Sequence, residues 1–262
     1  ALSFKPDYAE AYNNMGVAFQ EQGKLDEAID AYKNALAIKP DYGDARHMIS
    51  ALRGETTDKA PREYVEKLFD RNAAGFESLL VEKLEYSVPK ILADIISNQS
   101  SNSSLGSILD LGCGTGLFGL EIRNRCNYLE GIDLSKSMIK QSMSKNIYDK
   151  LEHSEIIEYL SCKELDFDYF VFADVFIYVG NLAEVFHLVK TKNNRNGKLV
   201  FSTEHTETDG FQLQTTGRYS HSKSYIEGLC KKFNYALSHF STSNLRKEEG
   251  ELIEGGLYVL DF

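Results

Sequence analysis

Residues 109–116 read LDLGCGTG, and residues 131–135 read GIDLS. The first stretch ends a short apolar run with three glycines at alternate positions, and the second places an acidic residue, Asp133, at the end of the next apolar run. Glycines directly after a strand let the backbone approach a ligand closely and adopt positive φ without a Cβ clash. A carboxylate at the end of the neighbouring strand can accept hydrogen bonds from both hydroxyls of a ribose. The two stretches therefore predict an α/β fold with a nucleotide-type binding site.

The spacing of the glycines separates two kinds of nucleotide fold. The run is G-x-G-x-G with Asp110 before it, and Leu117 follows Gly116, so it departs from the G-x-G-x-x-G pattern of dinucleotide enzymes. LDLGCGTG followed by GIDLS resembles the class I S-adenosylmethionine (SAM)-dependent methyltransferases. This resemblance implies SAM as the cofactor and S-adenosylhomocysteine (SAH) as its product.

Apolar and amphipathic segments alternate along this part of the chain. Strands are predicted at residues 107–111, 128–132, 146–149, 167–173 and 198–202, with helices at 117–125, 135–145 and 183–191. Such alternation is typical of a doubly wound parallel sheet. Two further runs, 233–240 and 256–260, have no helix between them and predict an antiparallel pair at one edge. The expected fold is therefore α/β, with a seven-stranded, Rossmann-like methyltransferase sheet.

The first fifty residues repeat with an offset of 34 residues. ALSFKP (1–6) and ALAIKP (35–40) are each followed by Asp-Tyr, and Gly16 and Ala28 are small where two antiparallel helices would touch. The pattern resembles a tetratricopeptide (TPR) repeat. Such a repeat either captures a partner protein in its groove or packs on the rest of the chain, and both roles stay open. We expect an all-α TPR segment over residues 1–52, a polar linker over 53–60 and the methyltransferase domain over 61–262.

Further stretches look like a bacterial family of predicted TPR-repeat-containing methyltransferases. They are residues 64–92, ADVFIYVG (173–180), FSTE (201–204), GRYSHS (217–222) and residues 226–229. The resemblance covers nearly the whole chain and includes the order of repeat, linker and methyltransferase. It implies the fold and the cofactor but no particular acceptor. In the family's first helix the pattern is F-D-x-Y-A-x-x-F-D, and here Asn72 replaces the aromatic residue.

Matching the methyltransferase motifs implies a set of cofactor contacts. Asp110, Gly112, Cys113, Gly114 and Gly116 are expected on the methionine side, Asp133 and Leu134 at the ribose and adenine, and Asp149, Lys150 and Leu151 at the adenine edge. Asp174 follows the fourth predicted strand, at the mouth between cofactor and acceptor. Its alternative role is the N-cap of the segment that contains residues 175–178.

Methyl transfer from a sulfonium is an in-line displacement, so positioning and desolvation do most of the work. A hydroxyl or ammonium acceptor must also lose a proton. His221 is the candidate general base because imidazole titrates near neutral pH, and Asp174 is the second catalytic candidate. The alternative is that His221 only orders its loop. Residues expected at the acceptor are Tyr178, Glu204, His205, Arg218, Tyr219 and Arg246.

Composition and charge argue against several classes of protein. The chain of 262 residues has a net charge of −10 and no run rich in Lys or Arg, which argues against a nucleic-acid partner. It has no apolar run of the roughly 18 residues that a membrane span needs and opens with no signal peptide. Four cysteines without a CxxC or Cys/His cluster predict reduced thiols, a cytoplasmic location and no metal site.

The expected function is SAM-dependent transfer of a methyl group to oxygen or nitrogen of a small molecule, a sugar or a carrier-bound acyl chain, in a bacterial cytoplasm. One alternative is a protein methyltransferase whose TPR groove captures the target. A second alternative is an adaptor in which the fold binds SAM weakly or not at all. The intact glycines and Asp133 argue against the adaptor.

Overall fold

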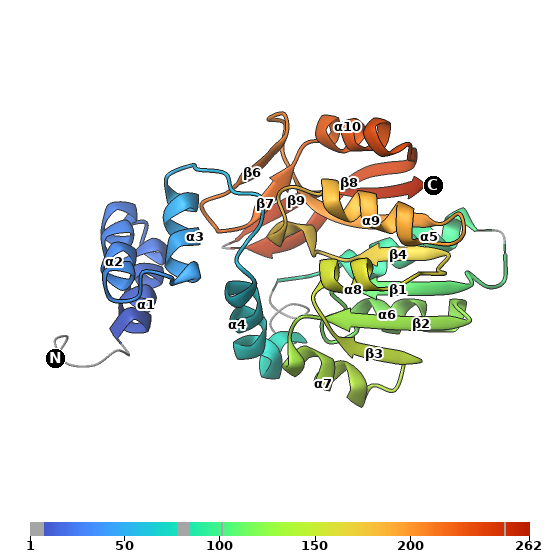
Figure 1. Ribbon diagram of the computed structural model, residues 1–262, viewed down its shortest axis with the longest axis horizontal. Coiled ribbons are helices and arrows are strands. Elements are labelled where there is room, and N and C mark those ends of the chain that lie inside the picture. The colour runs from blue at the N-terminus through green and yellow to red at the C-terminus, as the bar shows by residue number, and fades with distance from the viewer. Residues whose placement is uncertain (1–7, 78–83, 101, 249) are drawn as a thin grey trace.

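A computed structural model describes residues 8–77, 84–100, 102–248 and 250–262. Three helices lie side by side at one end of the molecule, and a mixed sheet flanked by helices forms the rest (Figure 1). Helix α4 (Arg62–Asn72) lies between the two parts. In the part of the chain that is described, none of the helices has the length and apolar character needed to cross a bilayer.

The helical end confirms the predicted TPR repeat. It consists of α1 (Tyr8–Glu21), α2 (Leu25–Ile38) and α3 (Gly43–Leu52). Helices α1 and α2 pack closely because Gly16 lies against the ring of Tyr32, where a Cβ would come within 2.6 Å of the ring. Ala28 and Ala35 are fully buried in the same contact. The small residues of the repeat therefore set the distance between its helices.

The sheet has the predicted doubly wound architecture. Seven strands form its main part: β1 (Ser107–Leu111), β2 (Tyr128–Asp133), β3 (Lys150–His153), β4 (Tyr169–Phe172), β5 (Lys198–His205), β8 (Ala236–Glu248) and β9 (Glu251–Asp261). The first five are parallel in the order β3-β2-β1-β4-β5, β9 runs antiparallel beside β5, and β8 pairs with β9. The predicted antiparallel pair at one edge is thus confirmed.

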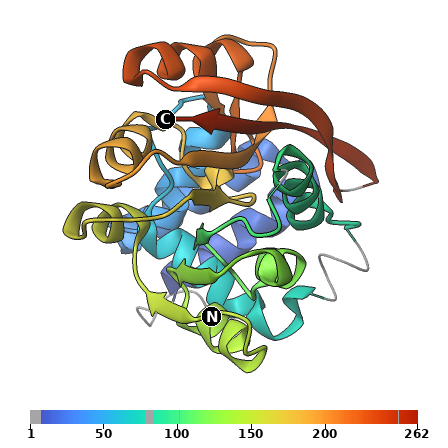
Figure 2. The same cartoon turned by 90° about the vertical axis from the view of Figure 1, so that its right-hand side faces the viewer.

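Both faces of the sheet are buried. Along β4, Phe170 and Phe172 pack on one face and Val171 on the other, as the period of two in a strand requires. The first face is covered by α8 (Ile156–Cys162), α9 (Ala183–Lys192) and α10 (Lys223–Phe233), and the second by α5 (Val88–Gln99) and α6 (Leu117–Ile122) (Figure 2). Helix α7 (Lys136–Ser144) follows β2. Short 3-10 turns span Ala73–Gly75, Arg123–Arg125 and Phe176–Tyr178.

A short hairpin extends the sheet beyond its predicted limits. Strand β6 (Phe211–Leu213) pairs with β7 (Tyr219–His221), and β7 runs parallel to the last two residues of β5. We expected GRYSHS to be a loop. Because each strand has three residues, the alternation of apolar and polar residues is too short to reveal them.

The third strand is displaced from its predicted place. It spans Lys150–His153, whereas we predict residues 146–149, a segment that includes the apolar pair Ile147 and Tyr148. Those two side chains pack instead beside Gly119, where a Cβ would lie 2.6 Å from the Tyr148 hydroxyl. The apolar residues therefore fill the gap beneath α6 before the strand begins, and the strand itself is only partly buried.

Candidate functional site

A cavity of about 590 Å³ lies at the carboxyl ends of the parallel strands, beneath α4. This is the edge at which ligands bind in open α/β sheets, and the volume lies within the usual range for small-molecule sites. Its wall includes Asp110, Gly112, Cys113, Gly114, Asp133, Leu134, residues 155–158, Asp174, Tyr178, Arg218 and Arg246.

The glycine loop after β1 needs its glycines for two different reasons. Gly112 has φ +76, and a Cβ there would come within 2.6 Å of the Val175 side chain. Gly114 has φ +54 and open space where a Cβ would stand, so its backbone is accessible to a ligand. Gly116, at φ +90, packs on Ser142 and lies outside the cavity wall. Two of the three glycines therefore line the site, and the third shapes the turn into α6.

Asp133 holds the loop and the next helix together at the end of β2. Its two carboxylate oxygens accept hydrogen bonds of 2.8 Å from the backbone N–H groups of Gly114 and Ser135. The side chain is nearly buried, and this burial raises the pKa of Asp133 to about 6. A carboxylate has lone pairs beyond these two bonds, so it can still accept from a ligand hydroxyl.

Asp110 lies below the loop with one oxygen unpartnered. Its Oδ2 accepts a hydrogen bond of 2.6 Å from the Tyr148 hydroxyl, whereas its buried Oδ1 has no partner among the residues that the structure describes. Burial raises the pKa of Asp110 to about 7. An unpartnered carboxylate oxygen in a cavity wall fits a ligand that carries an ammonium group. These donors and acceptors fit the methionine and ribose parts of SAM.

Asp149, Lys150 and Leu151, which we predict at the adenine edge, lie away from the cavity. None of these residues lies in the cavity wall, because β3 starts at Lys150 and its first residues belong to the opposite edge of the sheet. Asp149 instead pairs with Arg123 at 2.6 Å and accepts a hydrogen bond from the backbone N–H of Leu129. The wall at this side is formed by residues 155–158, which follow the strand.

At the other end of the cavity, Asp174 is bound into a cluster of charged side chains. It follows β4 with φ +58, and its Oδ2 accepts a hydrogen bond of 3.2 Å from Nη1 of Arg246, a residue of β8. Nη2 of Arg246 donates to Glu204, and Nη1 of Arg218 donates to Glu248. The predicted acceptor residues Arg218 and Arg246 are thus brought together with Asp174 although they come from distant parts of the sequence.

One oxygen of this cluster has no partner. Oδ1 of Asp174 is buried and accepts no hydrogen bond within the described residues. Burial raises the pKa of the Asp174 carboxyl, and Arg246 opposes that shift. The Asp174 side chain does not cap the 3-10 turn after it, since the N-cap of that turn is Val175 and carries no side-chain cap. The alternative role as an N-cap is therefore wrong.

His221 does not reach the cavity, which corrects its predicted role as the base. The ring is fully buried, and its Nε2 lies 2.9 Å from the carbonyl oxygen of Gly180. Burial lowers the pKa of His221 to about 4. Tyr219 and His221 are two residues apart in β7, so their side chains lie on the same face of that strand, and neither lines the cavity. His221 therefore orders its surroundings.

Three other predicted acceptor residues also stand outside the cavity wall. The hydroxyl of Tyr219 lies 2.6 Å from that of Thr57, and His205 lies 3.2 Å from Glu207. Glu204 contributes only through its ion pair with Arg246. Tyr178 does line the cavity, as predicted.

The helix that covers the cavity, α4, was only partly anticipated from the sequence. Phe69 and Asn72 line the cavity, so the helix covers the site although Asn72 replaces an aromatic residue. Asp70 fastens α4 to the start of α7, because its Oδ1 accepts hydrogen bonds from Ser135 Oγ at 2.5 Å and from the backbone N–H of Ser137 at 3.3 Å. The sequence signal that could have revealed this contact is Asp70, an acidic residue near the end of an amphipathic helix.

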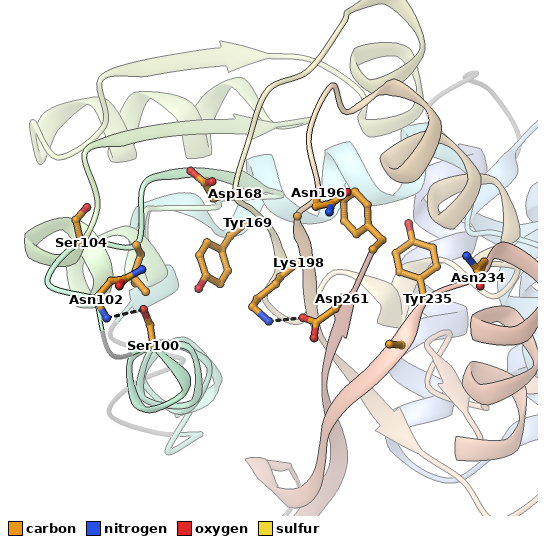
Figure 3. Close-up of a pocket in the computed structure, with 14 residues that line it drawn as sticks. Ser100, Asn102, Ser104, Asp168, Tyr169, Asn196, Lys198, Asn234, Tyr235 and Asp261 are labelled. Carbon is orange, nitrogen blue, oxygen red and sulfur yellow. Dashed lines mark hydrogen bonds and ion pairs between the residues drawn. The ribbon is translucent and has the colours of Figure 1, made fainter.

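A second hollow, of about 620 Å³, lies at the opposite edge of the sheet, where β4 and β5 begin (Figure 3). Its charged groups already have partners: Lys198 pairs with Asp261, and Asp168 accepts a hydrogen bond of 2.7 Å from the backbone N–H of Ser107. In the described residues, no group of three or more His, Cys, Asp or Glu side chains is placed to hold a metal ion. The candidate site is therefore the cavity under α4.

Comparison with known proteins identifies the families of the two parts of the chain. The family described as Methyltransferase domain matches residues 102–253, more than half of the chain, and the family described as Tetratricopeptide repeat matches residues 9–42. The small glutamine-rich tetratricopeptide repeat-containing protein 2 of Saccharomyces cerevisiae is 32% identical over 46% of this chain and 30% of its own length. The chain spans less than half of the length of the curated relatives that it matches.

Two solved structures share the fold at low sequence identity. Magnesium protoporphyrin IX methyltransferase from Synechocystis PCC 6803, solved with bound SAH, has a TM-score of 0.58 and 11% identity over 76% of this chain and 98% of its own. The 1,6-didemethyltoxoflavin-N1-methyltransferase of Burkholderia thailandensis has a TM-score of 0.59 and 10% identity over 79% of this chain and 92% of its own. The chain belongs to the methyltransferase domain family, with a TPR repeat ahead of that domain.

Proposed function

We propose that this chain is a SAM-dependent methyltransferase that binds SAM in the cavity under α4 and methylates oxygen or nitrogen of a small molecule. The observation that carries the proposal is the meeting of the positive-φ glycine loop with Asp110 and Asp133 in one cavity wall. When bound, SAM supplies a methyl group on a positively charged sulfur. The protein contributes binding, orientation and exclusion of water.

In this proposal we assign a part of SAM to each of several wall residues. Oδ1 of Asp110, which has no partner in the described part of the chain, is the acceptor for the ammonium group of the methionine part. Asp133 accepts from the ribose hydroxyls, and Gly114 leaves room for the backbone to approach the ligand. Leu134 and Ile156 supply apolar surface for the adenine ring.

Asp174 takes the place of His221 as the candidate proton acceptor. Gly112 lies against Val175, so Asp174 stands next to the methionine side of the loop. Its free Oδ1 can accept a proton or a hydrogen bond from a hydroxyl or an amine. The guanidinium groups of Arg218 and Arg246 are already paired with carboxylates.

The charged side chains at the Asp174 end of the cavity favour some acceptors over others. Two guanidinium groups face three carboxylates, those of Asp174, Glu204 and Glu248. An anionic acceptor would add to an excess of negative charge in a buried site, which is unfavourable. We therefore favour an alcohol or an amine over a carboxylate. The two neighbours described above act, by their names, on a porphyrin and a toxoflavin precursor, which supports a small-molecule acceptor.

Sinefungin tests both the cofactor and the role of Asp174. This analogue carries a protonated amine where SAM carries its methylsulfonium, and SAH carries neither. We expect sinefungin to bind at least about tenfold more tightly than SAH, because the amine makes a charge-assisted hydrogen bond to Asp174. The measurement is calorimetric titration of the full chain with each compound.

The variant Asp174→Asn should bind SAH with unchanged affinity and lose most of the preference for sinefungin. Glu207→Gln, which removes a carboxylate that is exposed and outside the cavity, is the matched control and should keep the preference. Equal affinities for the two compounds in the wild type would contradict the role of Asp174. Failure of both compounds to bind would contradict the proposed cofactor.

A further inference from the structure

One face of α3 lies against the methyltransferase part of the chain. Asp44, His47 and Ala51 are spaced three and four residues apart, so they share this face. Asp44 lies 3.8 Å from the ammonium group of Lys67 on α4, and Nε2 of His47 lies 2.8 Å from the carbonyl oxygen of Gly217. Ala51 is buried in a cluster that contains Tyr219. The face that a TPR helix would present to a partner is therefore covered.

Helix α1 is covered on the same side. Glu10 pairs with Arg71 at the end of α4, and the side-chain amide of Gln20 donates a hydrogen bond of 2.8 Å to the carbonyl oxygen of Thr215. Thr215 belongs to the turn between β6 and β7, residues 214–218, which we call the β6–β7 turn. The inner face of the TPR segment, formed by α1 and α3, thus holds α4 and the β6–β7 turn.

The predicted linker is bound along its length as well. In residues 55–60, which we call the strap, the Thr57 hydroxyl lies 2.6 Å from that of Tyr219. The backbone N–H of Ala60 donates to the carbonyl of Tyr178 at 3.0 Å, and the N–H of Gly180 donates to the carbonyl of Asp58 at 2.8 Å. The strap therefore fixes the TPR segment to the residues that follow β4.

The bond between His47 and Gly217 connects the TPR segment to the cavity. A carbonyl oxygen only accepts, so Nε2 of His47 must carry the proton. Burial lowers the pKa of His47, so the ring is a neutral single donor at that nitrogen. Gly217 has φ +79 and packs against Met48, and the next residue is Arg218, which lines the cavity and pairs with Glu248.

We propose that the TPR segment is a built-in support packed behind the acceptor end of the cavity, in which His47 is a positioning residue for Arg218. Its inner face is occupied by this chain's own β6–β7 turn, so a target protein is not captured there. The acceptor is instead a molecule that enters the cavity itself. This inference rests on the proposed function of the cavity and adds the part that the repeat takes in it.

The test compares His47→Ala with His47→Gln in the full chain. Loss of the donor leaves the Gly217 carbonyl unpaired, so the amides of Gln214 and Gly217, which close the β6–β7 turn, should exchange their hydrogens about tenfold faster. The side-chain Nε–H signal of Arg218 in a nitrogen-15 spectrum should shift or broaden. His47→Gln restores a donor and should restore both observations.

Two controls separate positioning from a general loss of stability. Ile49→Ala removes a buried side chain from the core of the TPR segment without removing a contact to the turn, so it should lower the melting temperature and leave the Arg218 signal in place. The Arg246 signal should persist in every variant, because strands β4, β5 and β8 hold its partners. An unchanged Arg218 signal in His47→Ala, no rescue by His47→Gln, or the same change in Ile49→Ala would each overturn the proposal. All three variants should bind SAH normally, so that failure of SAH binding in the wild type counts against the proposed function instead.

Discussion

Binding of the cofactor is expected to release protons, and Asp110 is their main source. Burial raises the pKa of Asp110 to about 7 and that of Asp133 to about 6. In the proposed complex an ammonium group lies beside Asp110 and hydroxyl donors lie beside Asp133. Both kinds of donor favour the ionised carboxylate. Bound cofactor therefore lowers both pKa values and expels the protons that these carboxyls held.

The two pKa values set the size of the effect. A carboxyl with a pKa of about 7 is about nine-tenths protonated at pH 6 and about one-tenth protonated at pH 8, and a carboxyl with a pKa of about 6 is about half protonated at pH 6. If both carboxyls are ionised in the complex, SAH is therefore expected to release about 1.4 protons at pH 6 and about a tenth of a proton at pH 8. By the same linkage, its dissociation constant should fall by about ten- to twentyfold between the two values.

The assay is calorimetric titration with SAH in several buffers of different ionisation enthalpy. The slope of the observed enthalpy against the buffer's ionisation enthalpy counts the protons released. Asp110→Asn should reduce the count at pH 6 to about half a proton, which Asp133 supplies. The reasoning would be refuted if the wild-type protein binds SAH at pH 6 with an observed enthalpy that does not depend on the buffer's ionisation enthalpy. Neither carboxyl would then change its protonation on binding.

Three further substitutions test separate parts of the structure. Gly112→Ala should weaken SAH binding more than about tenfold, because the residue has φ +76 and the added Cβ meets a side chain 2.6 Å away. The control is Gly210→Ala, at a residue with φ +91 and open space around it. Equal effects of the two substitutions on SAH affinity in calorimetry would contradict the role of Gly112. Asp70→Ala should speed SAH dissociation several-fold in surface plasmon resonance, because α4 loses its bond to Ser135; an unchanged rate would count against α4 as the cover. Burial lowers the pKa of His221 to about 4, so below about pH 6.5 the unfolded chain binds a proton that the folded chain does not, and stability falls with falling pH. His221→Gln lacks this dependence. Measured by denaturant unfolding, its free energy of unfolding should therefore fall by up to about 3 kcal/mol less between pH 7 and pH 4 than that of the wild type. Equal losses of unfolding free energy would contradict the assignment.

The sequence was informative where local chemistry decides the structure. Gly112 and Asp133 belong to short motifs at strand ends, and a motif of this kind places its residues at the carboxyl edge of the sheet whatever surrounds it. The repeat was visible because its small residues recur at a fixed spacing. Arg218 and Arg246 were expected near the acceptor, and the structure brings both into the cavity wall.

The sequence was less informative where side-chain direction or long-range packing decides. His221 follows Arg218 closely in the chain, but which side of a three-residue strand it faces depends on the pairing with β5. Ile147 and Tyr148 have the apolar character of a strand, and only the space beneath α6 shows why they precede one. The contact of His47 with Gly217 joins residues 170 positions apart, which no local pattern reveals.

The most direct test of the account is calorimetric titration of the full chain with SAM and with SAH near neutral pH, repeated on Gly112→Ala. We predict one molecule of either compound bound per chain, with micromolar affinity, and strongly weakened binding in the variant. If the wild-type chain is folded and binds neither compound, the cavity is not a SAM site, and the account of its glycine loop and carboxylates is contradicted.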